Sequence, residues 1–227
     1  MQVLEARPSV MSTAQDFLIK VYAWMAAGLA LTGVVSYLTV STGAIWNILP
    51  YIQPLALGLL AFVFLMQLGI RRISSTAAAA GFIVYAGLLG VTFAPIFLVY
   101  TSSSIAQVFF ITAGTFGGMS LYGMSTRTDL STVGSTCIMG FWGIFLASLA
   151  NLFFVHSDQW SWIISFIGVF VFTGLAAYDN QRLVRMAQQV DQNSEEGRKA
   201  TIIGALILYL DFINLFLSLL RLLGRRR

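Results

Sequence analysis

Apolar residues gather in seven long runs along the chain, and short polar connections separate most of them. The runs cover approximately residues 17–40, 50–70, 77–100, 105–124, 133–155, 160–178 and 202–223. Most are close to the roughly 20 residues with which a helix crosses the hydrocarbon core of a bilayer. Lipid offers no partner for backbone N–H and C=O groups, and the runs lack the alternating polarity of barrel strands, so we expect seven transmembrane helices.

The composition agrees with this pattern. Hydrophobic residues make up 58% of the chain and charged residues only 10%. No charge of either sign occurs from Val21 to Ile70, which is long enough for two crossings. The sequence therefore predicts an all-α membrane protein, a seven-transmembrane-helix bundle over residues 17–224. We expect a single long connection, residues 180–199.

The basic residues predict the orientation, since Lys and Arg in short loops stay on the cytoplasmic side. They lie in the N-terminal region and in the connections after the second, fourth and sixth runs, at Arg7, Lys20, Arg71, Arg72, Arg127, Arg182, Arg185, Arg198 and Lys199. We therefore expect a multi-pass protein whose N-terminal segment, residues 1–16, is cytoplasmic. Two alternatives remain for the basic tail, residues 225–227. A full last crossing would carry it outside, and a re-entrant hairpin broken near Asp211 and Asn214 would keep it inside.

The remaining polar residues exclude several functional classes. The net charge of +4 comes from basic residues that flank helices and form no stripe, so we expect no nucleic acid partner. The chain has one histidine, His156, at a helix end, and one cysteine, Cys137, within an apolar run. These two residues cannot supply the usual metal or nucleophile sites, and we expect no cofactor.

An intramembrane aspartyl protease is the strongest enzyme alternative, because such enzymes place one Asp after a Tyr in one helix and a second Asp in the next. Tyr178 and Asp179 fit the first half of that pattern. The second half fails, since residues 208–211 read LYLD where Gly-x-Gly-Asp is expected, and no proline follows Pro95. We therefore expect no enzyme.

Two aspartates lie at membrane depth, Asp211 in the middle of the last run and Asp179 at the end of the sixth. An ionised side chain in hydrocarbon costs several kcal/mol, so such residues usually face a bundle interior or a wet cavity and mark an ion or proton path. Two carboxyl groups in contact cannot both ionise cheaply, and they titrate as a coupled unit. The pair is thus a candidate proton sensor. The alternative is a buried polar clamp that fixes the helix register.

Spacing indicates the surroundings of the pair. Arg182 lies three positions after Asp179, and Asn214 three positions after Asp211, so each shares a helix face with its aspartate. Tyr178 and Tyr209 complete the expected neighbours. Two carboxylates, an amide and a few carbonyls fall short of the roughly six to eight oxygens of a tight Ca²⁺ site, so a metal at Asp179 and Asp211 would be weakly and transiently bound.

Five short motifs carry a resemblance to a known family. They are VYAWMAAGL at 21–29, TFAPIF at 92–97, MSLYG at 119–123, FTGLAAYDNQ at 172–181 and YLDFINLF at 209–216. In this order and over nearly the whole chain, the sequence resembles the transmembrane Bax inhibitor motif family, also called the Bax inhibitor-1 family. The resemblance is greatest to its bacterial inner-membrane branch.

The resemblance implies six helices around a central seventh, with an aspartate pair near the cytoplasmic side that senses pH. By motif this pair is Asp179 and Asp211. The function it implies is a pH-sensitive cation leak channel, with Ca²⁺ the favoured ion and the bacterial inner membrane the location. The alternative is a stress-linked interaction protein that modulates another membrane protein, such as a protease or channel. A proton-coupled transporter is a third reading, although no inverted repeat is evident.

One departure from the family concerns a latch. Structurally described members have an acidic residue in the second helix and an arginine near its cytoplasmic end that can bind the aspartate pair. Here the second run has no acid, and Gly69 stands about where the arginine would be. Arg71 and Arg72, just beyond it, are the candidate latch residues.

Overall fold

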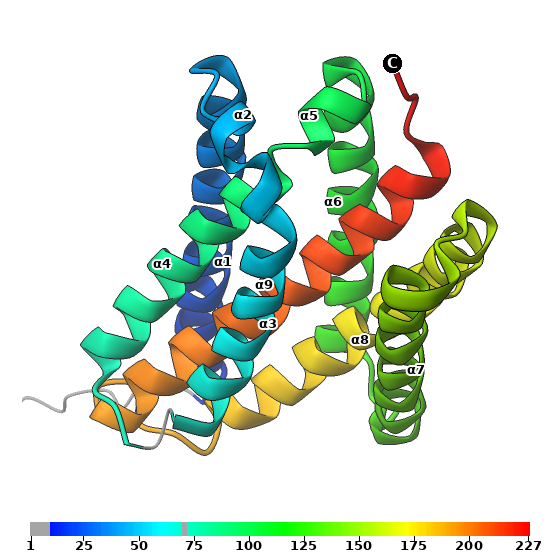
Figure 1. Cartoon of the computed structure of the whole chain (residues 1–227). Coiled ribbons are helices and arrows are strands. Elements are labelled where there is room, and N and C mark those ends of the chain that lie inside the picture. Colours follow the sequence, from blue (N-terminus) through cyan, green and yellow to red (C-terminus); the bar gives the residue numbers. More distant parts are fainter. Residues whose placement is uncertain (1–9, 70–71) are drawn as a thin grey trace, which may run out of the picture.

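The computed structural model describes residues 10–69 and 72–227, which form a bundle of helices (Figure 1). The long helices are α1 Val10–Ser41, α3 Ile52–Gly69, α4 Ser75–Phe93, α6 Ser102–Ser125, α7 Ser131–Ala150, α8 Asp158–Ala187 and α9 Glu195–Leu223. Shorter pieces extend three of them: α2 Ile45–Ile48 with a 3₁₀ turn Leu49–Tyr51, α5 Ile96–Val99, and a π-helical turn Asn151–Val155. Among the described residues, seven helical segments are long and apolar enough to cross a membrane, so the predicted fold class is confirmed.

Helix α9 is the centre of the bundle. Its most apolar stretch is 72% buried, compared with 39% in α8 and none in α7. Figure 1 shows α9 running obliquely between α1, α3 and α4 on one side and α7 and α8 on the other. It packs against α1, α4, α6 and α8, which confirms the expected central seventh helix.

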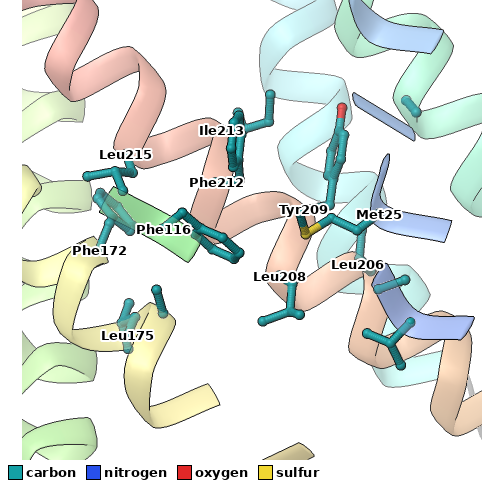
Figure 2. Packing of buried hydrophobic residues seen from close by; sticks show 14 of the residues in the cluster. Met25, Phe116, Phe172, Leu175, Leu206, Leu208, Tyr209, Phe212, Ile213 and Leu215 are labelled. Carbon is teal, nitrogen blue, oxygen red and sulfur yellow. The ribbon is translucent and has the colours of Figure 1, made fainter. Parts of the chain in front are cut away.

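Aromatic side chains fill the space around α9. Figure 2 shows Phe212 of α9 facing Phe116 of α6, with Phe172 of α8 beside Leu215. The rings of Phe116 and Phe212 lie 5.6 Å apart in an edge-to-face arrangement. Such pairs add about 0.5–1.5 kcal/mol to the burial of their area.

One glycine sets how closely α8 approaches α6. A Cβ atom placed on Gly123 of α6 would lie 2.1 Å from the carbonyl oxygen of Ala177 in α8. Because that neighbour is backbone, no side-chain movement could relieve the clash. Gly123 therefore lets the two backbones touch near the level of Asp179.

The last two helices are longer than their apolar runs. Helix α8 continues past Tyr178 to Ala187, and α9 begins at Glu195 rather than near Ile202, so the prediction of a long connection over 180–199 is wrong. The Ser194 hydroxyl accepts a hydrogen bond from the backbone N–H of Gly197, and acidic residues occupy the first turn of α9. Both features stabilise a helix start in water, where apolarity is not required.

The last helix also settles the two alternatives for the tail. Helix α9 is unbroken through Asp211 and Asn214, and the Asn214 side-chain amide donates to the carbonyl of Leu210 in the same helix at 2.8 Å. The backbone of the tail, residues 225–227, pairs with Val99 and Thr101 at the opposite end from the connection after α8. The re-entrant alternative is therefore wrong. We call the end with the connections after α3, α6 and α8 the predicted cytoplasmic end, and the end with the tail the predicted outer end.

The first helix begins earlier than its apolar run. Helix α1 starts at Val10, so part of the expected N-terminal segment 1–16 is helical. Polar residues such as Gln15 and Asp16 do not interrupt a helix that continues beyond the apolar run. Residues 1–9, with Arg7, lie outside the described residues.

Candidate proton and ion site

The two membrane aspartates lie on neighbouring helices in the bundle interior. Asp179 belongs to the second half of α8 and Asp211 to the middle of α9, and these antiparallel helices pack side by side. The residues are only 7% and 6% exposed. The two carboxyl groups lie close enough for each to affect the charge of the other. The fold thus brings together two acidic groups that are 32 positions apart in the sequence.

The hydrogen-bonding capacity of this pair is incomplete. Oδ2 of Asp211 is buried and has no hydrogen-bond partner in the part of the chain that the structure describes. An ionised carboxylate only accepts hydrogen bonds, so contact between two carboxyl groups becomes a hydrogen bond only when one of them carries a proton. Leaving a buried charge without a partner costs several kcal/mol. The geometry therefore suits a carboxyl pair that shares one proton.

Arg182 provides a partial counter-charge. Its Nη1 lies 3.9 Å from Oδ1 of Asp179, while its side chain is 52% exposed and that of Asp179 only 10%. An ion pair this long, with one partner in water, contributes little to stability. Arg182 therefore lies within reach of the pair without neutralising it.

The other predicted neighbours point elsewhere. The hydroxyl of Tyr209 bonds Oγ1 of Thr32 in α1 at 2.7 Å, because residues 209 and 211 lie about 200° apart around the helix. The ring of Tyr178 fills the space beside Gly134 of α7, where a Cβ atom would lie 2.4 Å from it. The Asn214 amide serves its own helix through Leu210, as described above.

The candidate latch residues are not joined to the aspartates by any contact among the described residues. Arg72 is exposed in the connection after α3, and Arg71 lies outside the described residues. The end of this connection is instead attached to the start of α9. Both the backbone N–H and the hydroxyl of Ser75 donate to the carboxylate of Glu195, which also pairs with Arg198 at 2.8 Å.

Sequence reasoning missed a second polar group beside the pair. Asn180 is fully buried, and its Oδ1 accepts a hydrogen bond from the hydroxyl of Tyr22 in α1. Its amide donates to Oγ of Ser120 in α6 at 3.0 Å and to the carbonyl of Ala176 at 2.7 Å. The signal was the unbroken polar stretch that starts at Asp179, because an amide at this depth also needs partners.

Two cavities lie on opposite sides of the aspartate pair. One, of about 340 Å³, is on the predicted outer side and is lined in part by Asn214, Ser218 and Arg221. The other, of about 270 Å³, is at the predicted cytoplasmic end and is lined in part by Tyr178 and Arg182. Because α8 and α9 are antiparallel, the residues three positions after the two aspartates lie in opposite directions. Along the helix axes the pair is therefore at a level between the two cavities, and neither cavity is lined by Asp179 or Asp211.

Comparison with known proteins agrees with the motifs. The family described as "Inhibitor of apoptosis-promoting Bax1" matches residues 14–227. The chain is similar to the inner membrane protein YbhL of Escherichia coli K12, with 44% identity over 94% of this chain and 93% of that protein.

Two further relatives have comparable coverage. A protein of Borreliella burgdorferi is 45% identical over 93% of this chain and 92% of its own length. A membrane protein of Streptococcus pyogenes serotype M3 is 37% identical over 92% of this chain and 93% of its own length. With residues 14–227 matched, the chain belongs to the Bax inhibitor-1 family of membrane proteins.

Proposed function

We propose that this protein is a pH-sensitive cation leak channel rather than an enzyme, and that Asp179 and Asp211 form its proton sensor. The observation that carries the proposal is the proximity of two buried carboxyl groups, at a level between two cavities along the helix axes. The family resemblance favours Ca²⁺ as the permeating ion. The motifs and the E. coli relative favour a bacterial inner membrane.

The orientation is part of the proposal. Arginine residues gather at one end of the bundle, with Arg72 and Arg127 in the connections after α3 and α6 and Arg198 in the first turn of α9. Since basic residues in short loops stay inside, we infer that this end, with the N-terminus, faces the cytoplasm. The aspartate pair would then respond to cytoplasmic pH through the cavity beside Arg182.

A shared proton would control the helix contact. With one proton between them, the two carboxyl groups hold α8 against α9. Loss of that proton adds a second negative charge in a region of low dielectric constant, where it must be met by a cation, by Arg182 or by separation of the helices. Cation flux should therefore rise as pH rises.

The groups around the pair leave few other sources of compensating charge. On α8 the charged neighbour is Arg182, and on α7 the thiol of Cys137 interacts with Asp211. Towards α1 and α6 the neighbouring contacts are the neutral bonds of Asn180 to Tyr22 and Ser120. A permeating cation would thus be the main alternative to Arg182.

The number of oxygens indicates a leak rather than a storage site. The pair offers at most four carboxylate oxygens, fewer than the roughly six to eight that bind Ca²⁺ tightly. Within residues 10–69 and 72–227, no group of three or more His, Cys, Asp or Glu could hold a metal ion. The ion would therefore keep part of its water while it passes.

The test is a flux measurement in liposomes that contain a calcium dye. The wild-type protein should pass Ca²⁺ faster at mildly alkaline than at mildly acidic pH, and both Asp179→Asn and Asp211→Asn should abolish this dependence. Asp158→Asn is the matched control, because Asp158 begins the same helix with a side chain that is 89% exposed. Flux equal to that of empty liposomes would contradict the channel. Flux with an unchanged pH profile in both variants would contradict the sensor.

A further inference from the structure

The cavity at the predicted cytoplasmic end, which we call the hollow, is lined by basic and neutral side chains. It has a volume of about 270 Å³ and is lined by Ser131, Tyr178, Arg182, Arg185, Met186 and Gln189. None of these residues is acidic, and two carry a guanidinium group. The hollow lies between the start of α7 and the last turns of α8. No residue in the most apolar stretch of α7 is fully buried, so this helix lies at the perimeter of the bundle, and the hollow lies beside it.

The two arginines are held differently. Arg185 is fixed by Oε1 of Gln181 at 2.7 Å and by Oδ1 of Asp129 at 3.3 Å. Hydrogen bonds from Ser131 lower the pKa of the Asp129 carboxyl, so this acid stays ionised and offsets part of the charge of Arg185. Among the described residues, Arg182 has only its 3.9 Å contact with Asp179, and its side chain is half exposed. The surplus positive charge of the hollow therefore belongs mainly to Arg182.

We propose that this hollow binds the phosphate of an anionic phospholipid headgroup, with Arg182 as its main partner and Arg185 as the second. A guanidinium group presents a planar set of donors that matches the oxygens of a phosphate. Basic pockets between helices at the cytoplasmic membrane surface are typical sites for anionic headgroups. The volume is several times the roughly 30 Å³ of one water molecule, which leaves room for a phosphodiester.

The neighbouring surface of α7 offers apolar contacts to the acyl chains of such a lipid. Ile138 and Trp142, seven and eleven positions after Ser131 on the same face of the helix, are 42% and 45% exposed. These apolar side chains continue from the hollow towards the middle of the membrane along the outside of the bundle. A phosphodiester held by Arg182 would thus have its acyl chains beside an apolar helix surface, which a free phosphate ion would not use.

Binding at this hollow is linked to the charge of Asp179. Arg182 cannot direct the same donors at a phosphate in the hollow and at the carboxylate of Asp179, so each partner weakens the other. Only the effect of this linkage on ion flux rests on the proposed leak. The binding itself is measured without flux, so the two proposals can fail separately.

The experiment measures lipid binding to the purified full-length protein in neutral detergent. Native mass spectrometry compares phosphatidylglycerol with phosphatidylcholine, and inorganic phosphate is added as a competitor. Arg182→Gln should weaken phosphatidylglycerol binding about tenfold and leave phosphatidylcholine unchanged. Arg127→Gln is the matched control, because this exposed arginine lies at the same end but does not line the hollow.

Three outcomes would overturn the proposal. They are equal binding of the two lipids, equal losses in Arg182→Gln and Arg127→Gln, and complete displacement of the lipid by equimolar inorganic phosphate, which would make free phosphate the ligand. Thermal unfolding in detergent shows whether Arg182→Gln is folded. If it is not, Asp179→Asn replaces it. This change frees Arg182 and should strengthen phosphatidylglycerol binding, and unchanged or weaker binding would contradict the role of Arg182.

Discussion

Two faces of α8 carry side chains of the same shape that differ in their hydrogen-bond partners. Asp179 and Asn180 are consecutive, have the same shape, and are 7% and 0% exposed. Asn180 is bonded to Tyr22 and Ser120, on two other helices. Asp179 instead meets a second carboxyl group, that of Asp211, whose Oδ2 has no partner.

The difference lies in what each group can donate. An amide donates and accepts at once, so Asn180 is satisfied at any pH. A carboxyl group can donate only while it holds a proton, so the contact of Asp179 with α9 depends on the pH of the solution. We infer that α8 is fixed on the side of α1 and α6 and adjustable on the side of α9.

The largest effect is expected when the hydrogen bonds that fix α8 to α1 and α6 are removed. Asn180→Leu would leave the buried hydroxyl of Ser120 and the half-buried hydroxyl of Tyr22 without their partner. We expect the free energy of unfolding to fall by about 2–4 kcal/mol, because each stranded group costs about 1–3 kcal/mol. Thermal unfolding in detergent measures this loss. A change below about 0.5 kcal/mol would mean that the bonds of Asn180 do not fix α8.

The next change replaces the proton-dependent contact between α8 and α9 with a hydrogen bond that needs no shared proton. In Asp211→Asn, an amide that needs no proton can donate to Asp179. The wild type should lose stability as pH rises, because the shared proton is then lost, whereas Asp211→Asn should not. We expect the variant to be more stable by about 1–2 kcal/mol at mildly alkaline pH. Unfolding temperatures across a pH series measure it, and parallel profiles for the two proteins would contradict a shared proton.

A smaller effect is expected at a neutral contact on α9 itself. Tyr209→Phe removes the hydroxyl that bonds Thr32, and Thr32 keeps its bonds to the carbonyls of Gly28 and Ala86. The variant should lose about 1 kcal/mol of stability, the usual contribution of one hydrogen bond. Its pH profile of flux should match that of the wild type. A shifted profile would assign Tyr209 to the sensor after all.

The smallest effect concerns charge at the predicted outer cavity. Arg221 lines this cavity and is exposed, so it repels a divalent cation that approaches Asp211 from that side. Arg221→Gln should raise Ca²⁺ flux by about twofold to fivefold at low ionic strength, and the gain should shrink in high salt. Liposome flux at two salt concentrations tests this. Reduced flux would indicate that Arg221 serves the path in another way.

The sequence predicted the parts of the molecule that the membrane dictates. Seven apolar runs became seven crossing segments, and the two acids at membrane depth came together, because a carboxyl group in lipid must face the interior. Parts outside the hydrocarbon were harder to predict. The end of α8 and the start of α9 are stabilised by caps and charges rather than by apolar residues. A search for apolar runs therefore ended the first helix too early and began the second too late.

Side-chain partners across helices were the least predictable feature. That Asn180 would bond Tyr22 and Ser120 depends on how α1, α6 and α8 are rotated against one another. Similarly, Tyr209 is close to Asp211 in sequence but is turned towards α1. Spacing within one helix predicts which residues share a face, whereas the identity of the opposite helix is decided by the packing of the whole bundle.

The basic tail bears on how the protein reaches its final topology. In the predicted orientation, residues 225–227 must be translocated against an inside-negative potential, which for three charges opposes crossing by roughly 7 kcal/mol at about 100 mV. Helix α9 also carries Asp211, so it is a poor autonomous insertion segment. We therefore expect α9 to enter the membrane last, after the preceding helices have assembled around the space that it fills.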